Sequence, residues 1–280
     1  MILKVFLVDA MVDGPFSGSP ITVLYLSSPL EMFKMASLAS EFGTAETVFI
    51  LPHGEAFLLR FFTPAKEIKM GVHGCQAAAH IIYELGICPP TAEVSFLTQE
   101  GEVLIRHHMP DFTSMEMDTE TREELNGDAK DSHAPLLSLD PKDVEWAIKT
   151  PGNDIILALS DYAVLKRLEP NLPAIMNSDF KAVSATVMAK QGADCDYCLR
   201  TFRPSREGAE EQSSGVINRS LAPHWAKLLQ KKSLAVRQLS KRGGIMTIEL
   251  PSSDKLIFKG RARTVLRADI VLENVATNPL

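Results

Sequence analysis

The sequence has few cysteines and no excess of positive charge, two features that mark large classes of protein. It contains only 4 cysteines among 280 residues, too few for the disulfide framework of a secreted domain. It also lacks an excess of positive charge, because 29 Lys and Arg stand against 35 Asp and Glu, for a net charge of −6. This balance argues against a protein built mainly to bind nucleic acid or anionic lipid.

Long hydrophobic runs are absent as well. No stretch approaches the roughly 20 apolar residues that a membrane-spanning helix needs. The apolar N-terminal segment is interrupted by Lys4 and ends at Asp9, so it does not have the pattern of a secretory signal peptide. We therefore expect a cytoplasmic protein with reduced cysteines and with neither a membrane nor a nucleic-acid partner.

The composition that is present is ordinary for a globular protein, with 45% hydrophobic, 23% charged and 7% aromatic residues. The length suggests two domains. Residues 119–135 are polar and rich in Thr, Glu, Asp and Lys, which is typical of a linker. We predict a first half over 1–118, a linker over 119–135 and a second half over 136–280.

Local patterns predict several elements of the first half. Apolar residues at helical spacing predict a helix over 30–42, and Gly43 stands where a C-terminal cap belongs. Residues 71–85 are typical of a glycine-flanked loop that opens a helix. Strands are predicted at 3–8, 21–26, 56–63, 93–98 and 102–107, the last two forming a hairpin.

The second half is predicted to begin with a helix over 141–149, with Asp140 as N-cap and Pro141 in the first turn. Gly260 separates two expected C-terminal strands. Further helices are predicted at 162–168 and about 215–230, and strands at 154–159, 181–187, 196–202, 234–238, 244–250, 255–259 and 261–266.

One pattern occurs in both halves. Phe62-Thr63-Pro64 precedes Gly74 by a distance similar to that between Phe202-Arg203-Pro204 and Gly215. Each half therefore has a strand, a proline, a loop, a glycine and a helix, as a duplicated α/β unit would. Two helix N-termini, with their exposed backbone N–H groups, would suit a carboxylate ligand.

Five segments, in order, carry a resemblance to a known family. They are VFLVDAMVDGPFSGSPITVLYL, ASLASEFGTAETVFI, LRFFTPAKEIKMGVHGCQAAAHII, CLRTFRPSREGAEEQSSGVINRSLAPHWAKLL, and SKRGG followed by GRARTVL. The chain resembles the phenazine-biosynthesis PhzF-like family, whose fold is that of diaminopimelate epimerase. The resemblance implies an α+β fold of two pseudo-symmetric halves, each a curved sheet or barrel around a central helix. It also implies an active site in the cleft between the halves, a homodimer, and no metal or organic cofactor.

In the first half, the resemblance assigns catalytic roles to two residues. Glu46, in AETVF, matches the family's proton-shuttling glutamate, and His73 matches the histidine of its GHAT-like motif. Gly74 and Cys75 would bind substrate through backbone N–H groups at the helix start. Without the resemblance, Glu46 is interpreted as a surface glutamate, His73 as a capping or packing residue and Cys75 as a buried core residue.

In the second half, Glu211 falls on the family's catalytic aspartate, and Val216 replaces its serine. Backbone N–H groups of Ser214, Gly215 and Val216 would still bind substrate. The alternative is that residues 206–212 form a solvated acidic loop. The cysteine pair of the related epimerases falls on Gly71 and Ser214, so two-cysteine racemisation is not expected.

Cys195 and Cys198 form a C-x-x-C pair. A zinc site would need two further ligands, and the sequence offers no second pair at suitable spacing. In the predicted strand over 196–202, residues three apart point to opposite faces. We therefore interpret both cysteines as structural.

Together these features predict a cofactor-independent isomerase that moves a proton between carbons of a small carboxylate metabolite. Glu46 would be the acid and base, and His73 and Glu211 would position the substrate. The alternatives are a catalytically eroded family member that binds a metabolite or protein, and a lyase, dehydratase or single-base epimerase on the same fold.

Overall fold

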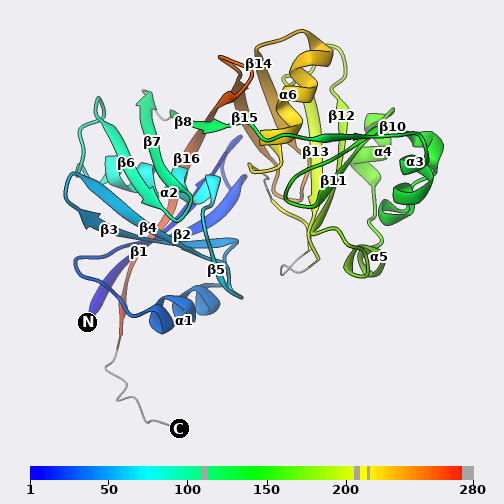
Figure 1. The fold of residues 1–280 in the computed structure, drawn as a ribbon. Coiled ribbons are helices and arrows are strands. Elements are labelled where there is room, and N and C mark those ends of the chain that lie inside the picture. Colours follow the sequence, from blue (N-terminus) through cyan, green and yellow to red (C-terminus); the bar gives the residue numbers. More distant parts are fainter. Residues whose placement is uncertain (109–111, 205–208, 213–214, 273–280) are drawn as a thin grey trace. The chain divides into compact units, whose positions relative to one another are not determined.

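The computed structural model describes all residues except 109–111, 205–208, 213–214 and 273–280 (Figure 1). The chain forms two compact units. The first consists of Met1–Ala10, Ser19–Met115 and Arg261–Leu280, and the second of Met11–Gly18 and Glu116–Gly260. These units differ from the predicted halves, because the C-terminal strand pairs with the N-terminal one. The predicted linker carries a strand and a helix.

The first unit is a closed eight-stranded barrel. The strands, in order around it, are β1 (Ile2–Ala10), β2 (Ser19–Tyr25), β3 (Glu46–His53), β4 (Ala56–Phe62), β6 (Glu93–Thr98), β7 (Gly101–His108), β8 (Phe112–Asp118) and β16 (Lys255–Val271). Antiparallel pairing between β1 and β16 closes the barrel. A short strand, β5 (Glu67–Ile68), pairs with the end of β4.

Helix α2 (Val72–Glu84) lies inside the strands of this barrel (Figure 1). Ten of its 13 residues are buried, so nearly every face of the helix contacts the barrel rather than solvent. Gly74, Cys75 and the three alanines 77–79 keep the helix thin enough to approach β1, β2 and β3. This helix is the one predicted from the glycine-flanked segment over 71–85.

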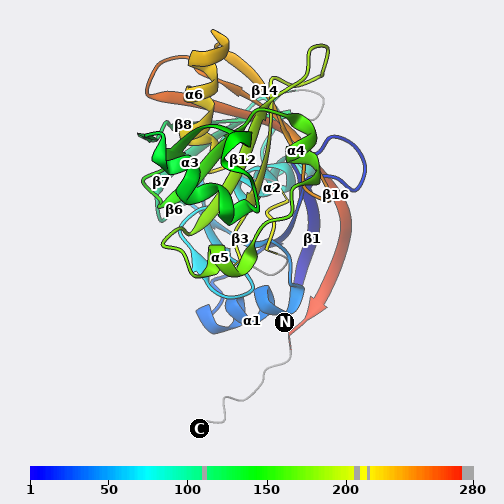
Figure 2. The same cartoon turned by 90° about the vertical axis from the view of Figure 1, so that its right-hand side faces the viewer.

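Helix α1 (Met32–Phe42) covers the outer side of the same strands (Figures 1 and 2). Its buried face consists of Met35, Leu38 and Ala39. Gly43 ends the helix in the left-handed conformation, at φ 60°, and its N–H donates to the Ala39 carbonyl over 3.2 Å. The predicted helix and its glycine cap are confirmed. In the part of the chain that the structure describes, no helix is both long and apolar enough to span a membrane.

The second unit is a twisted sheet with helices on both faces. Its strands, in order, are β9 (Glu123–Leu125), β10 (Val144–Lys149), β11 (Asp154–Leu159), β12 (Ala182–Met188), β13 (Tyr197–Phe202), β14 (Ser233–Gln238), β15 (Gly244–Glu249) and the first residues of β16. Figure 1 shows α6 (Asn218–Leu229) on one face. The other face carries α3 (Asp128–His133), α4 (Tyr162–Arg167) and α5 (Leu172–Met176), which lie in front in Figure 2.

Aromatic side chains hold α6 on its sheet. The Trp225 ring stacks on Tyr197 of β13, with ring centroids 5.6 Å apart. The Trp225 indole N–H donates to the Thr186 hydroxyl of β12 over 3.0 Å, and Tyr197 donates to Asn218 Oδ1 over 2.6 Å. The buried polar atoms of both rings are thereby paired, as burial requires.

The two units repeat one topology. In the first, β1–β2 is antiparallel, β2–β3 parallel, β3–β4 antiparallel and β4–β6 parallel, with α2 between the last two strands. In the second, β10–β11, β11–β12, β12–β13 and β13–β14 follow the same sequence of pairings, with α6 in the last crossover. Phe62 and Phe202 occupy equivalent ladder positions, opposite Thr47 and Val183. The repeated Phe-x-Pro pattern therefore marks a structural repeat.

Two predicted elements are wrong. Residues 141–149 are not a helix: Asp140 does cap a first turn, through Lys142 N–H, but that turn, η2 (Pro141–Asp143), is a single 3-10 turn. Strand β10 follows and pairs with β9 and β11, which together override the local helix signal. Gly260 does not separate two strands either, because β16 continues through it over 17 residues.

Candidate functional site

Glu46 is the first residue of β3, and its side chain lies against the N-terminal end of α2. A β-carbon added at Gly71 would stand 2.0 Å from Glu46 Oε2, and one added at Gly74 would stand 2.8 Å from the same atom. Val48 and Phe61 crowd the Gly74 position equally closely, at 2.8 and 2.9 Å. Glu46 is only 7% exposed. The two glycines are thus required by the close approach of a buried carboxylate.

The turn before Glu46 is held by hydroxyl groups. Thr44 donates from its hydroxyl to the Glu46 carbonyl over 2.9 Å. The same hydroxyl lies 3.0 Å from Thr22 Oγ1 on the neighbouring strand β2. These contacts tie the backbone of Glu46 to the preceding turn and to β2, which limits the positions that its carboxylate can take.

The start of α2, which lies against this carboxylate, has a regular helical N-terminus. Gly71 is the N-cap, and the Cys75 N–H donates to the Gly71 carbonyl over 2.9 Å as the first helical hydrogen bond. The N–H groups of Val72, His73 and Gly74 come before that bond, at the positive end of the helix dipole. His73 is buried there, at 5% exposure.

Cys75 does not suit the substrate-binding role predicted for it. Its N–H is used within the helix, and its side chain is fully buried. Burial raises the pKa of the Cys75 thiol, and the charge of Glu46 raises it further. A thiol in this state is not reactive, so the structure favours the alternative of a core residue.

Glu211 lies in a buried network of charges in the second unit. Arg203 Nε donates to Glu211 Oε1 over 2.9 Å, and Arg203 Nη1 lies 3.4 Å from Asp154 Oδ1. The Glu211 carbonyl accepts from the Gln238 side chain over 3.1 Å. Burial raises the pKa of Asp154, although Arg203 acts in the opposite direction. Glu211 is therefore a buried, paired carboxylate rather than part of a solvated acidic loop.

Sequence reasoning missed Arg203 and Asp154. Arg203 is the middle residue of the second Phe-x-Pro pattern, at the position that Thr63 has in the first. This difference between the repeats could have indicated Arg203 as a functional residue, because a charged side chain stands at the end of β13 where the first repeat has a hydroxyl. Asp154 stands at the start of β11 with no neighbouring motif.

The remaining predicted residues precede α6. Gly215 is buried and accepts a hydrogen bond at its carbonyl from the Asn218 N–H over 3.1 Å. Val216 is 43% exposed, and Ser214 lies outside the described residues. The helix begins at Asn218, three residues later than predicted. Glu46, His73 and Gly74 thus share one end of α2 in the first unit, whereas Glu211, Gly215 and Val216 belong to the second.

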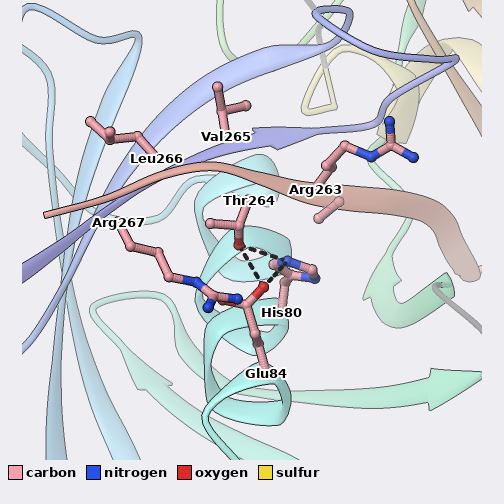
Figure 3. A pocket seen from close by; sticks show the side chains of 8 residues that line it. His80, Glu84, Arg263, Thr264, Val265, Leu266 and Arg267 are labelled. Carbon is pink, nitrogen blue, oxygen red and sulfur yellow. Dashed lines mark hydrogen bonds and ion pairs between the residues drawn. The ribbon is translucent and has the colours of Figure 1, made fainter.

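A polar pocket of about 380 Å³ lies at the other end of α2 (Figure 3). Thr264 of β16 donates to Glu84 Oε2 over 2.8 Å and lies 3.0 Å from His80 Nε2. Arg267 donates to Glu84 Oε1 over 3.0 Å. None of the predicted site residues lines this pocket, and its carboxylate, Glu84, already binds Arg267 and Thr264, so it is not the candidate active site.

Comparisons with known proteins cover nearly the whole chain. An uncharacterised isomerase of Pseudomonas aeruginosa is 29% identical over 272 residues, 97% of this chain and 100% of the relative. An uncharacterised isomerase of Halalkalibacterium halodurans is 27% identical over 273 residues, with the same coverage. A crystal structure of a PhzF-family phenazine biosynthesis protein from Enterococcus faecalis has a TM-score of 0.85 at 24% identity, covering 97% of this chain and 100% of that one.

These likenesses agree with the fold, an α+β architecture of two similar halves of the diaminopimelate epimerase type. The sequence profile of the phenazine biosynthesis-like proteins, PhzC-PhzF, matches residues 8–268. The chain therefore belongs to the PhzF-like, phenazine biosynthesis-like protein family.

Proposed function

We propose that the protein is an isomerase that moves a proton between carbons of a small carboxylate metabolite, without a cofactor, and that Glu46 is its acid and base. The observation that carries this proposal is the buried Glu46 carboxylate against two glycines at the start of α2. The names of the relatives, which include isomerases, support the reaction class.

Glu46 would act by alternating between its two protonation states. As a carboxylate it takes a proton from one carbon of the substrate, and as the acid it returns that proton to another carbon. The N–H groups at the start of α2 favour an anion, so negative charge that develops on the substrate would be stabilised there. We assign His73, in the same turn, to hydrogen bonding with the substrate.

The close approach of Glu46 to Gly71 favours a mechanism with one catalytic base over a mechanism with two. The related epimerases have a cysteine where this chain has Gly71, and here Glu46 Oε2 would lie 2.0 Å from any β-carbon at that position. A carboxylate at Glu46 and a side chain at 71 exclude one another in this arrangement. Proton transfer by a single carboxylate is therefore the chemistry that fits these residues.

Glu211 is proposed as a positioning residue. Its Oε1 already accepts a hydrogen bond from Arg203. It would act through Arg203 and through the backbone of the segment that leads to Gly215 and Val216, whose N–H groups are proposed to bind the substrate carboxylate.

Hydrogen exchange in D₂O tests the proposal. The protein is incubated with small cyclic and unsaturated amino- and hydroxy-carboxylates, and NMR follows the loss of C–H signals. We expect exchange or isomerisation of one substrate class, slowed at least about 10²-fold by Glu46→Gln. The matched control is Glu55→Gln, which changes an exposed glutamate in the turn between β3 and β4. Exchange that persists in Glu46→Gln would contradict the assignment of the base.

The same experiment separates the alternatives. Tight binding of a carboxylate with no exchange would point to a catalytically eroded binding protein. Exchange at one carbon with inversion would indicate a single-base epimerase, and loss of water or of a carbon–carbon bond would indicate a dehydratase or lyase.

We also propose that the protein works as a cytoplasmic homodimer. Apolar side chains are exposed where β1 meets β16: Ile2 and Val271 face one another in the ladder and are 68% and 70% exposed. Burial of such a pair against a second copy would be favourable. Light scattering on the purified protein should give twice the mass of one chain, and the mass of one chain would contradict the dimer.

A further inference from the structure

The C-x-x-C pair does not have the geometry expected from a strand. Strand β13 begins at Tyr197, so Cys195 lies in the turn before it rather than within it. The turn brings Cys195 Sγ to 3.6 Å from Cys198 Sγ. The prediction that the two side chains diverge is therefore wrong, and two free thiols lie in contact.

The surroundings distinguish the two sulfur atoms. Cys198 is 1% exposed and belongs to the core, whereas Cys195 is partly exposed at its edge. Arg237 on β14 is anchored by Asp13 over 2.5 Å and by Asp194, the neighbour of Cys195, over 2.5 Å. A fixed guanidinium beside the accessible sulfur favours its thiolate form.

The titration of the pair agrees with this geometry. The hydrogen bond between the thiols lowers the pKa of Cys195, and Arg237 lowers it further, although burial acts in the opposite direction. The same hydrogen bond, followed by burial, raises the pKa of Cys198. Its exposure and the neighbouring guanidinium thus make Cys195 the nucleophilic sulfur, with Cys198 as its hydrogen-bond partner.

We propose that Cys195 and Cys198 form a reversible disulfide on reaction with a hydroperoxide, which makes this turn an oxidation site separate from the proposed active site. A metal is the competing ligand for such a pair. Among the described residues, however, no group of three or more His, Cys, Asp and Glu side chains is arranged to hold a metal ion.

The reaction balances in two steps. The Cys195 thiolate attacks one peroxide oxygen, so an S–O bond forms, the O–O bond breaks and an alcohol or water leaves after protonation. The Cys198 sulfur then attacks the sulfenic acid: the S–S bond forms, the S–O bond breaks, and the departing hydroxide takes the Cys198 proton to give water. The dithiol loses two electrons to the peroxide, and a dithiol reductant returns them.

Small movements suffice for the second step. A disulfide needs the sulfur atoms at about 2.05 Å, and they start at 3.6 Å. Cys195 precedes β13 and belongs to no strand, so its approach breaks no strand pairing. Cys198 need not leave its place in β13, where it pairs with Val187. The ladders around the pair can therefore persist in both redox states.

Mass spectrometry of the full-length protein tests the proposal, with Cys88 as an internal control. Cys88 is also partly exposed, but burial raises its pKa. After hydrogen peroxide and alkylation, we expect a Cys195–Cys198 cross-link, a loss of about 2 Da, and recovery with dithiothreitol. In the folded, reduced protein, Cys195 should react with iodoacetamide about tenfold faster than Cys88.

Variants separate the two sulfur atoms. Cys198→Ala should leave a sulfenic acid at Cys195 that a 1,3-dione traps, and Cys195→Ala should leave Cys198 unmodified. Arg237→Gln should slow alkylation of Cys195 about threefold or more and leave Cys88 unchanged. If Cys198→Ala does not fold, the proposal is tested by the alkylation rates of Cys195 and Cys88 and by the cross-link in the wild-type protein. Failure of the cross-link to form, or equal rates at Cys195 and Cys88, would overturn the proposal.

Discussion

The segments that lead into α2 and α6 hold equivalent places in the repeated topology, but they carry different charges. Before α2, the Glu46 carboxylate lies against Gly71 and Gly74. Before α6, Glu211 and Asp154 share Arg203. The repeat thus conserves the backbone frame while the side chains diverge. One frame supports a buried carboxylate beside two glycines, and the other supports two carboxylates that share a guanidinium. The proposed function assigns proton transfer to the first and positioning to the second.

The largest expected effect follows from exchanging the two glutamates for glutamine separately. Glu46→Gln should lower the rate of substrate exchange by about 10² to 10⁴, the range for loss of a general acid or base. Glu211→Gln should lower it less and should change KM more than kcat, because a positioning residue acts through binding. The measurement is kcat and KM of both variants with one substrate. An equal loss of kcat in both variants would contradict the different roles assigned to the two glutamates.

The next effect concerns the network in the second unit. Arg203→Met should lower the free energy of unfolding by about 3–5 kcal/mol, because it removes the guanidinium that pairs with two buried carboxylates. The measurement is urea denaturation followed by circular dichroism. Adding Asp154→Asn and Glu211→Gln to Arg203→Met should recover most of the loss. A loss below about 1 kcal/mol in Arg203→Met would show that the network is effectively solvated.

The glycine contact in the first unit gives a smaller, local effect. Gly71→Ala should displace the Glu46 carboxylate and slow exchange about 10²-fold, with about 1–3 kcal/mol lost in stability from overpacking. Glu46→Ala combined with Gly71→Ala should be more stable than the sum of the single changes predicts. Gly127→Ala is the control, because nothing lies within 4 Å of its added β-carbon. Additive effects of the two single changes on the free energy of unfolding would contradict the contact between Glu46 and position 71.

The smallest effect is on pH dependence. Burial lowers the pKa of His80 in the first unit and of His133 and His224 in the second. The unfolded chain therefore binds protons that the folded chain does not, and stability falls as pH decreases through about 6.5. Chemical denaturation at pH 7.5 and pH 5.5 measures the fall. His80→Gln and His224→Gln should each reduce it, and an unchanged fall in both would assign it to other groups.

Many helices and strand ends could be predicted from the sequence because they depend on short sequence patterns. The apolar spacing before Gly43 gives α1, and Phe-x-Pro gives the repeated strand ends. Residues 144–149 became a strand instead of a helix because pairing on both sides outweighs a capped first turn. No local pattern contains that information.

The candidate site shows the same limit. Glu46 and His73 could be predicted from motifs, but the reason for two glycines beside Glu46 is a contact across 25 or more positions of sequence. Arg203 and Asp154 are brought together by the β11–β13 region of the sheet, and the cysteine pair by where β13 begins. Such contacts depend on strand order and on the exact start of a strand.

Strand β16 has a consequence for how the protein is made. Its last residues pair with β1 and close the first barrel, so β1 leaves the ribosome long before its closing partner. The first unit therefore cannot complete its barrel until β16 has been synthesised, whereas nearly all of the second unit precedes that strand in the chain. Folding of the first unit should therefore follow synthesis of β16, and a chain that stops before residue 261 should leave β1 without its closing partner.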